Sequence, residues 1–159
     1  MYQNAIVTTD GSELAAVAMK HVPQVLSPDG RVTVVEVVDS VGQVLAKTTP
    51  AGFELAAMTD GRLAEEIVEA QRAEAARHLE EAKAALTGAG MKNVETIILD
   101  GIPGDRIVEL AQERRADVIV MATHGRSGLK RAVLGSVADH VLRHLEGVAM
   151  LLVNPVEHN

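Results

Sequence analysis

Hydrophobic and polar positions follow two different periods along the chain. Five short runs rich in β-branched residues, each about as long as a buried strand, occupy residues 5–8, 31–38, 94–99, 117–122 and 148–153. Between these runs, apolar residues recur every three or four positions, which is the spacing of an amphipathic helix. The alternation predicts a doubly wound α/β fold whose parallel strands are joined by right-handed crossovers.

Four helices are predicted, over residues 12–22, 61–87, 104–116 and from 136 onward. Ser12 and Asp105 are candidate N-caps of the first and third helices, and Pro23 should end or kink the first. One side of the fourth helix carries its apolar residues, which are Ala138, Val141, Leu142 and Leu145. Residues 39–62 hold three Gly and one Pro without a sustained period, so a mobile loop is expected there.

Composition narrows the classes of function. A chain of 159 residues with 47% hydrophobic residues is long enough for one domain with one sizeable core. One Tyr, one Phe and no Trp argue against base stacking, and a net charge of −7 disfavours nucleic acid and membrane surfaces as partners. The absence of Cys excludes disulfides, thiolate metal sites and cysteine nucleophiles. Neither a leader pattern nor an apolar run of about 18 residues is found, so a cytoplasmic protein is expected.

Three predicted strand ends are candidate parts of a ligand site. In an open α/β sheet, ligands bind beyond the carboxyl ends of the strands, where the winding direction reverses. The strand ends in question are residues 9–12, 37–39 and 121–125. The third leads into a glycine-rich segment that finishes with Gly135 and Ser136 at a predicted helix start. Glycine lets the backbone approach an anion, and the first N–H groups of the helix point towards it.

Charge supports a phosphate site in this segment. Between Ala122 and Ser136 there are three basic residues and no acidic one, and the basic residues are Arg126, Lys130 and Arg131. Neither the P-loop motif nor the dinucleotide-binding glycine motif is present. An alternative interpretation is that the glycines form ordinary turns and that Gly135-Ser136 is an ordinary helix cap.

The same segment resembles a known signature. The pattern "ATHG", nine residues, then "GS" is similar to the nucleotide-binding motif of the universal stress protein family, G-x2-G-x9-G-[ST]. Gly125, Gly135 and Ser136 match the motif, whereas Ala122 takes the place of its first glycine. The resemblance covers nearly the whole chain, from "AIVTTDGSELA" to "VAMLLVNP".

The resemblance implies a single domain with a five-stranded parallel sheet in the order 3-2-1-4-5, and a homodimer formed through the last strand, Val148 to Val153. It also implies ATP, with or without Mg²⁺, across the ends of the first, second and fourth strands. The site residues it implies are Thr9, Asp10, Val37, Met121, Ala122, His124, Gly125, Arg126, Gly128, Gly135, Ser136 and Val137.

Several of these residues have an alternative structural role. Asp10 is equally suited to be a helix N-cap, and Val37 and Met121 are equally suited to be core residues. His124 could order its loop through a hydrogen bond. The run "VAMLLV" is either an internal strand or an edge strand that would pair with another chain.

Enzymatic chemistry has little support in the sequence. His140 and His144 are four residues apart on a predicted helix, a spacing that could serve one metal ion. They should point away from the apolar side of that helix, so no metal site is predicted. No nucleophile and base pair is found at the strand ends, and at most slow ATP hydrolysis is expected.

The favoured hypothesis is an ATP-binding regulatory dimer that acts in stress survival and signals to an unknown protein partner. Two alternatives stay open. One is a nucleotide-independent protein-interaction module of the same fold, and the other is a sensor of AMP or a cyclic nucleotide. Fold alone does not decide between them.

Overall fold

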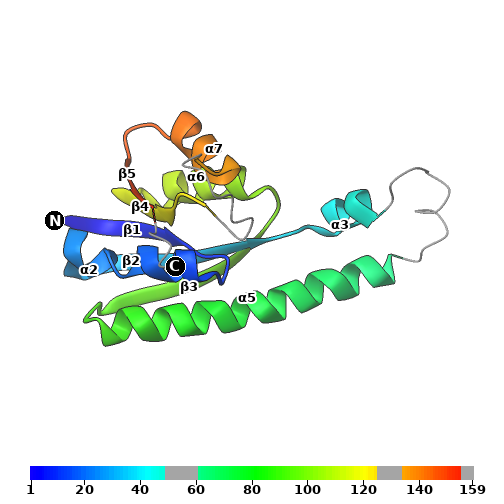
Figure 1. Ribbon diagram of the computed structural model, residues 1–159, viewed down its shortest axis with the longest axis horizontal. Coiled ribbons are helices and arrows are strands. Elements are labelled where there is room, and N and C mark those ends of the chain that lie inside the picture. Colours follow the sequence, from blue (N-terminus) through cyan, green and yellow to red (C-terminus); the bar gives the residue numbers. More distant parts are fainter. Residues whose placement is uncertain (49–60, 125–133, 155–159) are drawn as a thin grey trace, which may run out of the picture.

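The computed structural model describes residues 1–48, 61–124 and 134–154, and these form one five-stranded parallel sheet with helices on both faces (Figure 1). The strand order is β3-β2-β1-β4-β5, with every neighbouring pair parallel. The predicted strand number, direction and order are therefore confirmed. The strands are β1 (Tyr2–Thr8), β2 (Leu26–Val38), β3 (Asn93–Asp100), β4 (Val118–Ala122) and β5 (Ala149–Val153).

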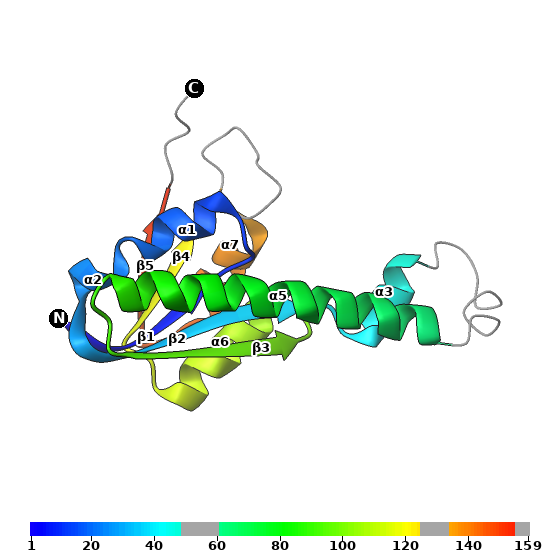
Figure 2. The ribbon, with the colours of Figure 1, turned by 90° about the horizontal axis from the view of Figure 1, so that it is seen from below.

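Helices cover both faces of the sheet, as a doubly wound fold requires. The helices α1, α2 and α5 pack on one face, and α6 and α7 pack on the other. Figure 2 shows α5 running along the sheet and continuing beyond it, towards α3. The described helices are α1 (Glu13–Met19), α2 (Val22–Val25), α3 (Val41–Thr48), α5 (Arg62–Gly88), α6 (Pro103–Arg114) and α7 (Ser136–His144).

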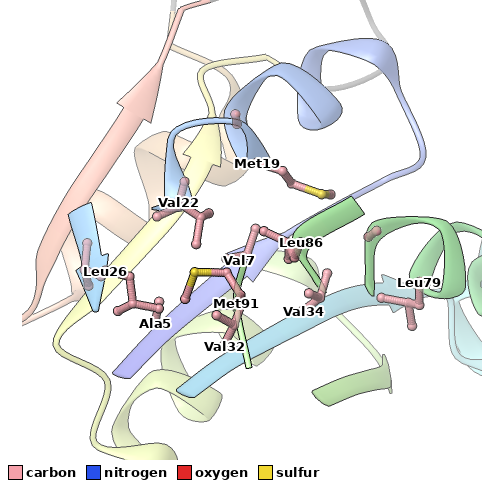
Figure 3. Packing of buried hydrophobic residues seen from close by; sticks show 14 residues of the cluster. Ala5, Val7, Met19, Val22, Leu26, Val32, Val34, Leu79, Leu86 and Met91 are labelled. Carbon is pink, nitrogen blue, oxygen red and sulfur yellow. The ribbon is translucent and has the colours of Figure 1, made fainter. Parts of the chain in front are cut away.

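Two aliphatic clusters form the core, one on each face of the sheet. On the first face, Val7 and Val34 meet Met19 and Leu86 (Figure 3). On the second face, Ile6, Val35 and Ile119 of the sheet meet helices α6 and α7. Each fully buried side chain of this size stabilises the fold by roughly 1.5–3 kcal/mol. Because successive strand residues point to opposite faces, neighbouring residues such as Ile6 and Val7 serve different clusters.

The expectation of a mobile loop over residues 39–62 is wrong for its first part. Residues Val41–Thr48 form α3, whose Val44 is buried against Ala64 and Val68 of α5. Ser40 caps this helix: its Oγ accepts from the Gln43 N–H at 3.3 Å, and its own N–H donates to Gln43 Oε1 at 2.8 Å. This reciprocal arrangement is a capping box. Residues 49–60 lie outside the described residues.

Helix ends differ in detail from the predictions. Ser12 is confirmed as the N-cap of α1, since its Oγ accepts from the Ala15 N–H at 3.2 Å. The helix ends at Met19, and Pro23 lies in the first turn of the separate helix α2, where its missing N–H costs nothing. Asp105 is not the cap of α6, because Ile102 holds that position. Leu142, expected on the apolar side of α7, is 51% exposed.

Candidate functional site

A cavity of about 230 Å³ lies where the carboxyl ends of β1, β2 and β4 meet the first turns of α6 and α7. Parallel pairing places these strand ends at one edge of the sheet, where ligands of α/β proteins bind. The cavity is lined by nine of the predicted site residues, which are Thr9, Asp10, Val37, Met121, Ala122, His124, Gly135, Ser136 and Val137. The other three, Gly125, Arg126 and Gly128, lie outside the described residues.

The turn between β1 and α1 forms one wall of the cavity. The Thr9 N–H donates to the Val35 carbonyl at 3.0 Å, and its Oγ1 accepts from the Gly11 N–H at 3.1 Å. The Asp10 carboxylate accepts from the Ser12 N–H at 3.0 Å. Asp10 therefore closes the turn, while Ser12 caps the helix. The alternative interpretation of Asp10 as the N-cap is wrong, and Asp10 lines the cavity.

The segment after β4 forms another part of the cavity wall. The Gly135 N–H donates to the Thr123 carbonyl at 2.7 Å, so the start of α7 is held against the end of β4. His124 Nδ1 lies 2.8 Å from Thr123 Oγ1, which is the loop-ordering hydrogen bond proposed as an alternative for this histidine. His124 also lines the cavity. The two interpretations of His124 are therefore compatible.

Ala122 lies at the end of β4, where it pairs with Val153 of β5. Among the described residues other than glycine, only Arg115 has a positive φ. The backbone at Ala122 therefore does not require glycine, and the alanine that departs from the family motif is accommodated without strain.

The first turn of α7 has the chemistry of an anion site. Gly135 precedes the helix in an extended conformation and offers no side-chain cap. The first backbone hydrogen bond of the helix runs from the Asp139 N–H to the Gly135 carbonyl at 2.9 Å. The N–H groups of Ser136, Val137 and Ala138 come before it, at the positive end of the helix dipole. This arrangement suits a phosphate or carboxylate group.

The rest of the cavity is apolar. Val37 and Met121 line it together with Val35, Ile107 and Val137. Met121 is 4% exposed and belongs to the second core cluster, so it is both a core residue and a wall of the cavity. An apolar region next to an uncapped helix start suits a ligand that has both an apolar part and an anionic group.

Seven lining residues were not among the predicted site residues, although one of them, Thr123, lies in the predicted strand end 121–125. They are Thr8, Ala15, Val35, Pro103, Ile107, Thr123 and Ala138. The sequence held a signal for Pro103. It follows Gly101 at the carboxyl end of β3, so the strand-end rule would have included it. The sequence pattern predicts an ordinary core residue at Ile107. Its position at the cavity follows only from the packing of α6 against the sheet.

The predicted direction of His140 is wrong. Its Nε2 lies 2.8 Å from Asp105 Oδ1, so the side chain faces α6 rather than solvent. The ring stacks on His144 with centroids 4.1 Å apart, and it packs against Gly104. Within the part of the chain that the structure describes, no group of three His, Cys, Asp or Glu side chains could hold a metal ion.

In the described ranges, no helix is both long and apolar enough to cross a membrane. The fold and the cavity together define a doubly wound α/β protein with a cavity at the reversal point of its sheet. A profile of the universal stress protein family matches residues 1–151, and the chain belongs to this family.

Individual relatives agree with this assignment. The universal stress protein MJ0531 of Methanocaldococcus jannaschii is 31% identical over 156 residues, covering 98% of this chain and 84% of the relative. The structure of MJ0577 from the same organism superposes with a TM-score of 0.80 at 28% identity, covering 99% of both chains. An AMP-bound family member from Arabidopsis thaliana has the same fold, with a TM-score of 0.60, 16% identity and coverage of 94% and 90%.

Proposed function

We propose that this universal stress protein binds ATP and acts in the cytoplasm as a nucleotide-dependent regulatory dimer in stress survival. The observation that carries the proposal is the single cavity that joins an apolar wall to the uncapped start of α7. An adenine nucleotide matches these two regions of the cavity, because it joins a flat base to an anionic phosphate chain.

The cavity is large enough for only part of an ATP molecule. Its volume of about 230 Å³ lies below the roughly 300–1,000 Å³ of sites that enclose a whole ligand. The base and ribose would fill it, with the base against Val37 and Met121 and the ribose hydroxyls donating to the Asp10 carboxylate. The phosphates would follow Gly135, Ser136 and Val137, where backbone N–H groups donate to them.

Magnesium would accompany a triphosphate mainly through the nucleotide's own oxygens. The described residues offer no cluster of three ligating side chains for a metal ion, and Mg²⁺ retains several waters when phosphates hold it. The chain's part would be to fix the phosphates. Hydrolysis of the bound nucleotide would be slow at most.

A nucleoside monophosphate or cyclic nucleotide is the second candidate. The family member from Arabidopsis thaliana was solved with AMP bound, and the described cavity does not need three phosphates to be filled. A competition experiment with ATP, AMP and cyclic AMP at one protein concentration would rank the three ligands by affinity.

Dimerisation is proposed through β5. This strand lies at the edge of the sheet, and all five of its residues are only partly buried. An apolar edge strand with unpaired backbone groups favours pairing with another chain. A second copy would satisfy these groups and cover the exposed side chains.

The test begins with the nucleotide released when the purified native protein is denatured, identified by mass and absorbance, followed by ATP titration of the emptied protein. The double variant Gly135→Leu/Ser136→Leu should lose rebinding, while Gly88→Ala, at the far end of α5, should keep it. Recovered nucleotide, or micromolar rebinding that the double variant loses, supports the proposal. No recovery and no rebinding would favour the nucleotide-independent interaction module.

A further inference from the structure

A buried imidazole and carboxyl pair lies behind the proposed nucleotide site. His78 of α5 and Glu36 of β2 are 8% and 7% exposed. His78 Nδ1 lies 3.0 and 3.2 Å from the two carboxyl oxygens of Glu36. Val35 and Val37, on either side of Glu36, line the cavity. Because strand residues alternate between faces, Glu36 points to the opposite face from the cavity, towards α5.

The imidazole ring packs directly on Gly11. A Cβ at this position would lie 2.2 Å from His78 Cε1 and 2.4 Å from each ring nitrogen. Gly11 also has a φ of +75°, which side-chain-bearing residues rarely adopt. Glycine is therefore required at this point of the turn for two reasons, and one of them is the ring of His78.

Gly11 belongs to the turn that forms one wall of the cavity. Its N–H donates to Thr9 Oγ1, and the next residue donates to the Asp10 carboxylate. Moving Gly11 would therefore displace both Thr9 and Asp10. A chain of direct contacts runs from Glu36 through His78 and Gly11 to the two cavity residues.

A second cavity of about 340 Å³ lies between α1 and α5, and both Thr9 and His78 line it. Much of its remaining lining is small, with Ala16, Ala82 and Ala85 among it. Without the imidazole, the turn would have room to move back into this space. The imidazole ring of His78 thus holds the turn in place through its direct contact with Gly11.

We infer that His78 is a positioning residue: it holds the turn at residues 9–12 in the conformation that binds the nucleoside, and Glu36 fixes the imidazole. The inference rests on the proposed function for its effect on affinity. The contact between the ring and the turn can be measured without any nucleotide.

The experiment uses His78→Asn, with His78→Ala as a second variant. The Asn amide can still donate to Glu36 but lacks the part of the ring that contacts Gly11. Leu79→Ala is the matched control, because Leu79 is a buried neighbour on the same helix that packs in the core. For each protein, the amide resonances of Gly11 and Ser12, the ATP dissociation constant and the denaturation midpoint are measured.

We expect His78→Asn to shift the Gly11 and Ser12 resonances of the nucleotide-free protein and to weaken ATP binding by about fivefold or more. Leu79→Ala should lower the denaturation midpoint yet change the dissociation constant by less than about twofold. His78→Ala should weaken ATP binding at least as much as His78→Asn does.

Three results would overturn the inference: unchanged turn resonances in both His78 variants, an unchanged dissociation constant in both, or an equal loss of affinity in Leu79→Ala. Should wild-type protein bind no adenine nucleotide, the proposed function fails. The resonances of His78→Asn then decide by themselves whether the imidazole fixes the turn.

Discussion

The backbone N–H of Gly135 donates to the carbonyl oxygen of Thr123 at 2.7 Å, and a Cβ at Gly135 would lie 2.8 Å from that same oxygen. The close approach of the two backbones is thus what sets the start of α7 against the end of β4. Thr123 in turn donates its own N–H to Val153 of the edge strand at 2.9 Å. Thr123 therefore connects the sheet edge, the cavity and the start of α7.

Gly135→Ala should weaken nucleotide binding and lower the free energy of unfolding by about 1–3 kcal/mol. The new methyl group would meet a backbone oxygen, which cannot rotate away as a side chain can. The start of α7 must then shift relative to β4. Chemical denaturation and ATP titration of the same variant measure both effects.

Gly88→Ala is the matched control for this substitution. Nothing lies within 4 Å of a Cβ placed there, and Gly88 is the last residue of α5. Alanine in place of glycine in a helix contributes up to about 1 kcal/mol of stability. A Gly135→Ala protein as stable and as tight-binding as Gly88→Ala would show that the close approach is unimportant.

His140→Ala should lower the free energy of unfolding by about 1–2 kcal/mol, because His140 joins α7 to the first turn of α6 through Asp105. A double-mutant cycle with Asp105→Ala should give a coupling energy of about 0.5–1 kcal/mol. Arg143→Ala, which removes an exposed pair with Asp139 on the same helix, should change stability little. Zero coupling between His140 and Asp105 would mean that their contact contributes only packing.

The fold could be predicted from the sequence because the buried strands are short, β-branched and separated by helical patterns. β4, for example, has four buried residues in its five, so its apolar run leaves few alternative assignments. The strand-end rule pointed to residues 9–12, 37–39 and 121–125, and each of these strand ends contributes residues to the lining of the cavity. These predictions depend only on periodicity and on a general property of parallel sheets.

Predictions that depended on contacts between distant segments failed. The helical wheel placed His140 away from the core, but α6 packs beside α7 and Gly104 leaves space for the imidazole ring. The same wheel placed Leu142 on the apolar side, but Leu142 is 51% exposed. α3 was missed because its capping box, Ser40 and Gln43, lies in a glycine-containing segment that reads as a loop.

The contact between α3 and the rest of the protein should weaken in acid through Asp39. Burial alone would raise the pKa of this carboxyl group, but hydrogen bonds from Lys47 and Gln71 outweigh it and hold the pKa below 3.8. Its stabilising contribution is therefore complete above pH 3.8 and is lost as the pH falls through the lowered pKa.

A carboxyl NMR titration would measure the pKa of Asp39 directly, and hydrogen exchange corrected for intrinsic rates would report the loosening of α3. Asp39→Asn should remove this part of the acid response while leaving the protein folded at neutral pH. A pKa at or above the ordinary value would contradict the prediction.

The edge strand β5 gives the last prediction. Ala149 donates its N–H inward to the Asp117 carbonyl at 3.0 Å, and because strand residues alternate, the N–H of Met150 points to the free edge. Met150→Pro removes that donor and should give a monomer, whereas Met150→Ala loses most of the same side chain, keeps the donor and should stay dimeric. The wild-type melting temperature should rise with protein concentration, as mass action requires of a dimer. Sedimentation at several protein concentrations would measure the oligomeric state of the wild type and of both variants. A monomeric wild type would exclude pairing through β5.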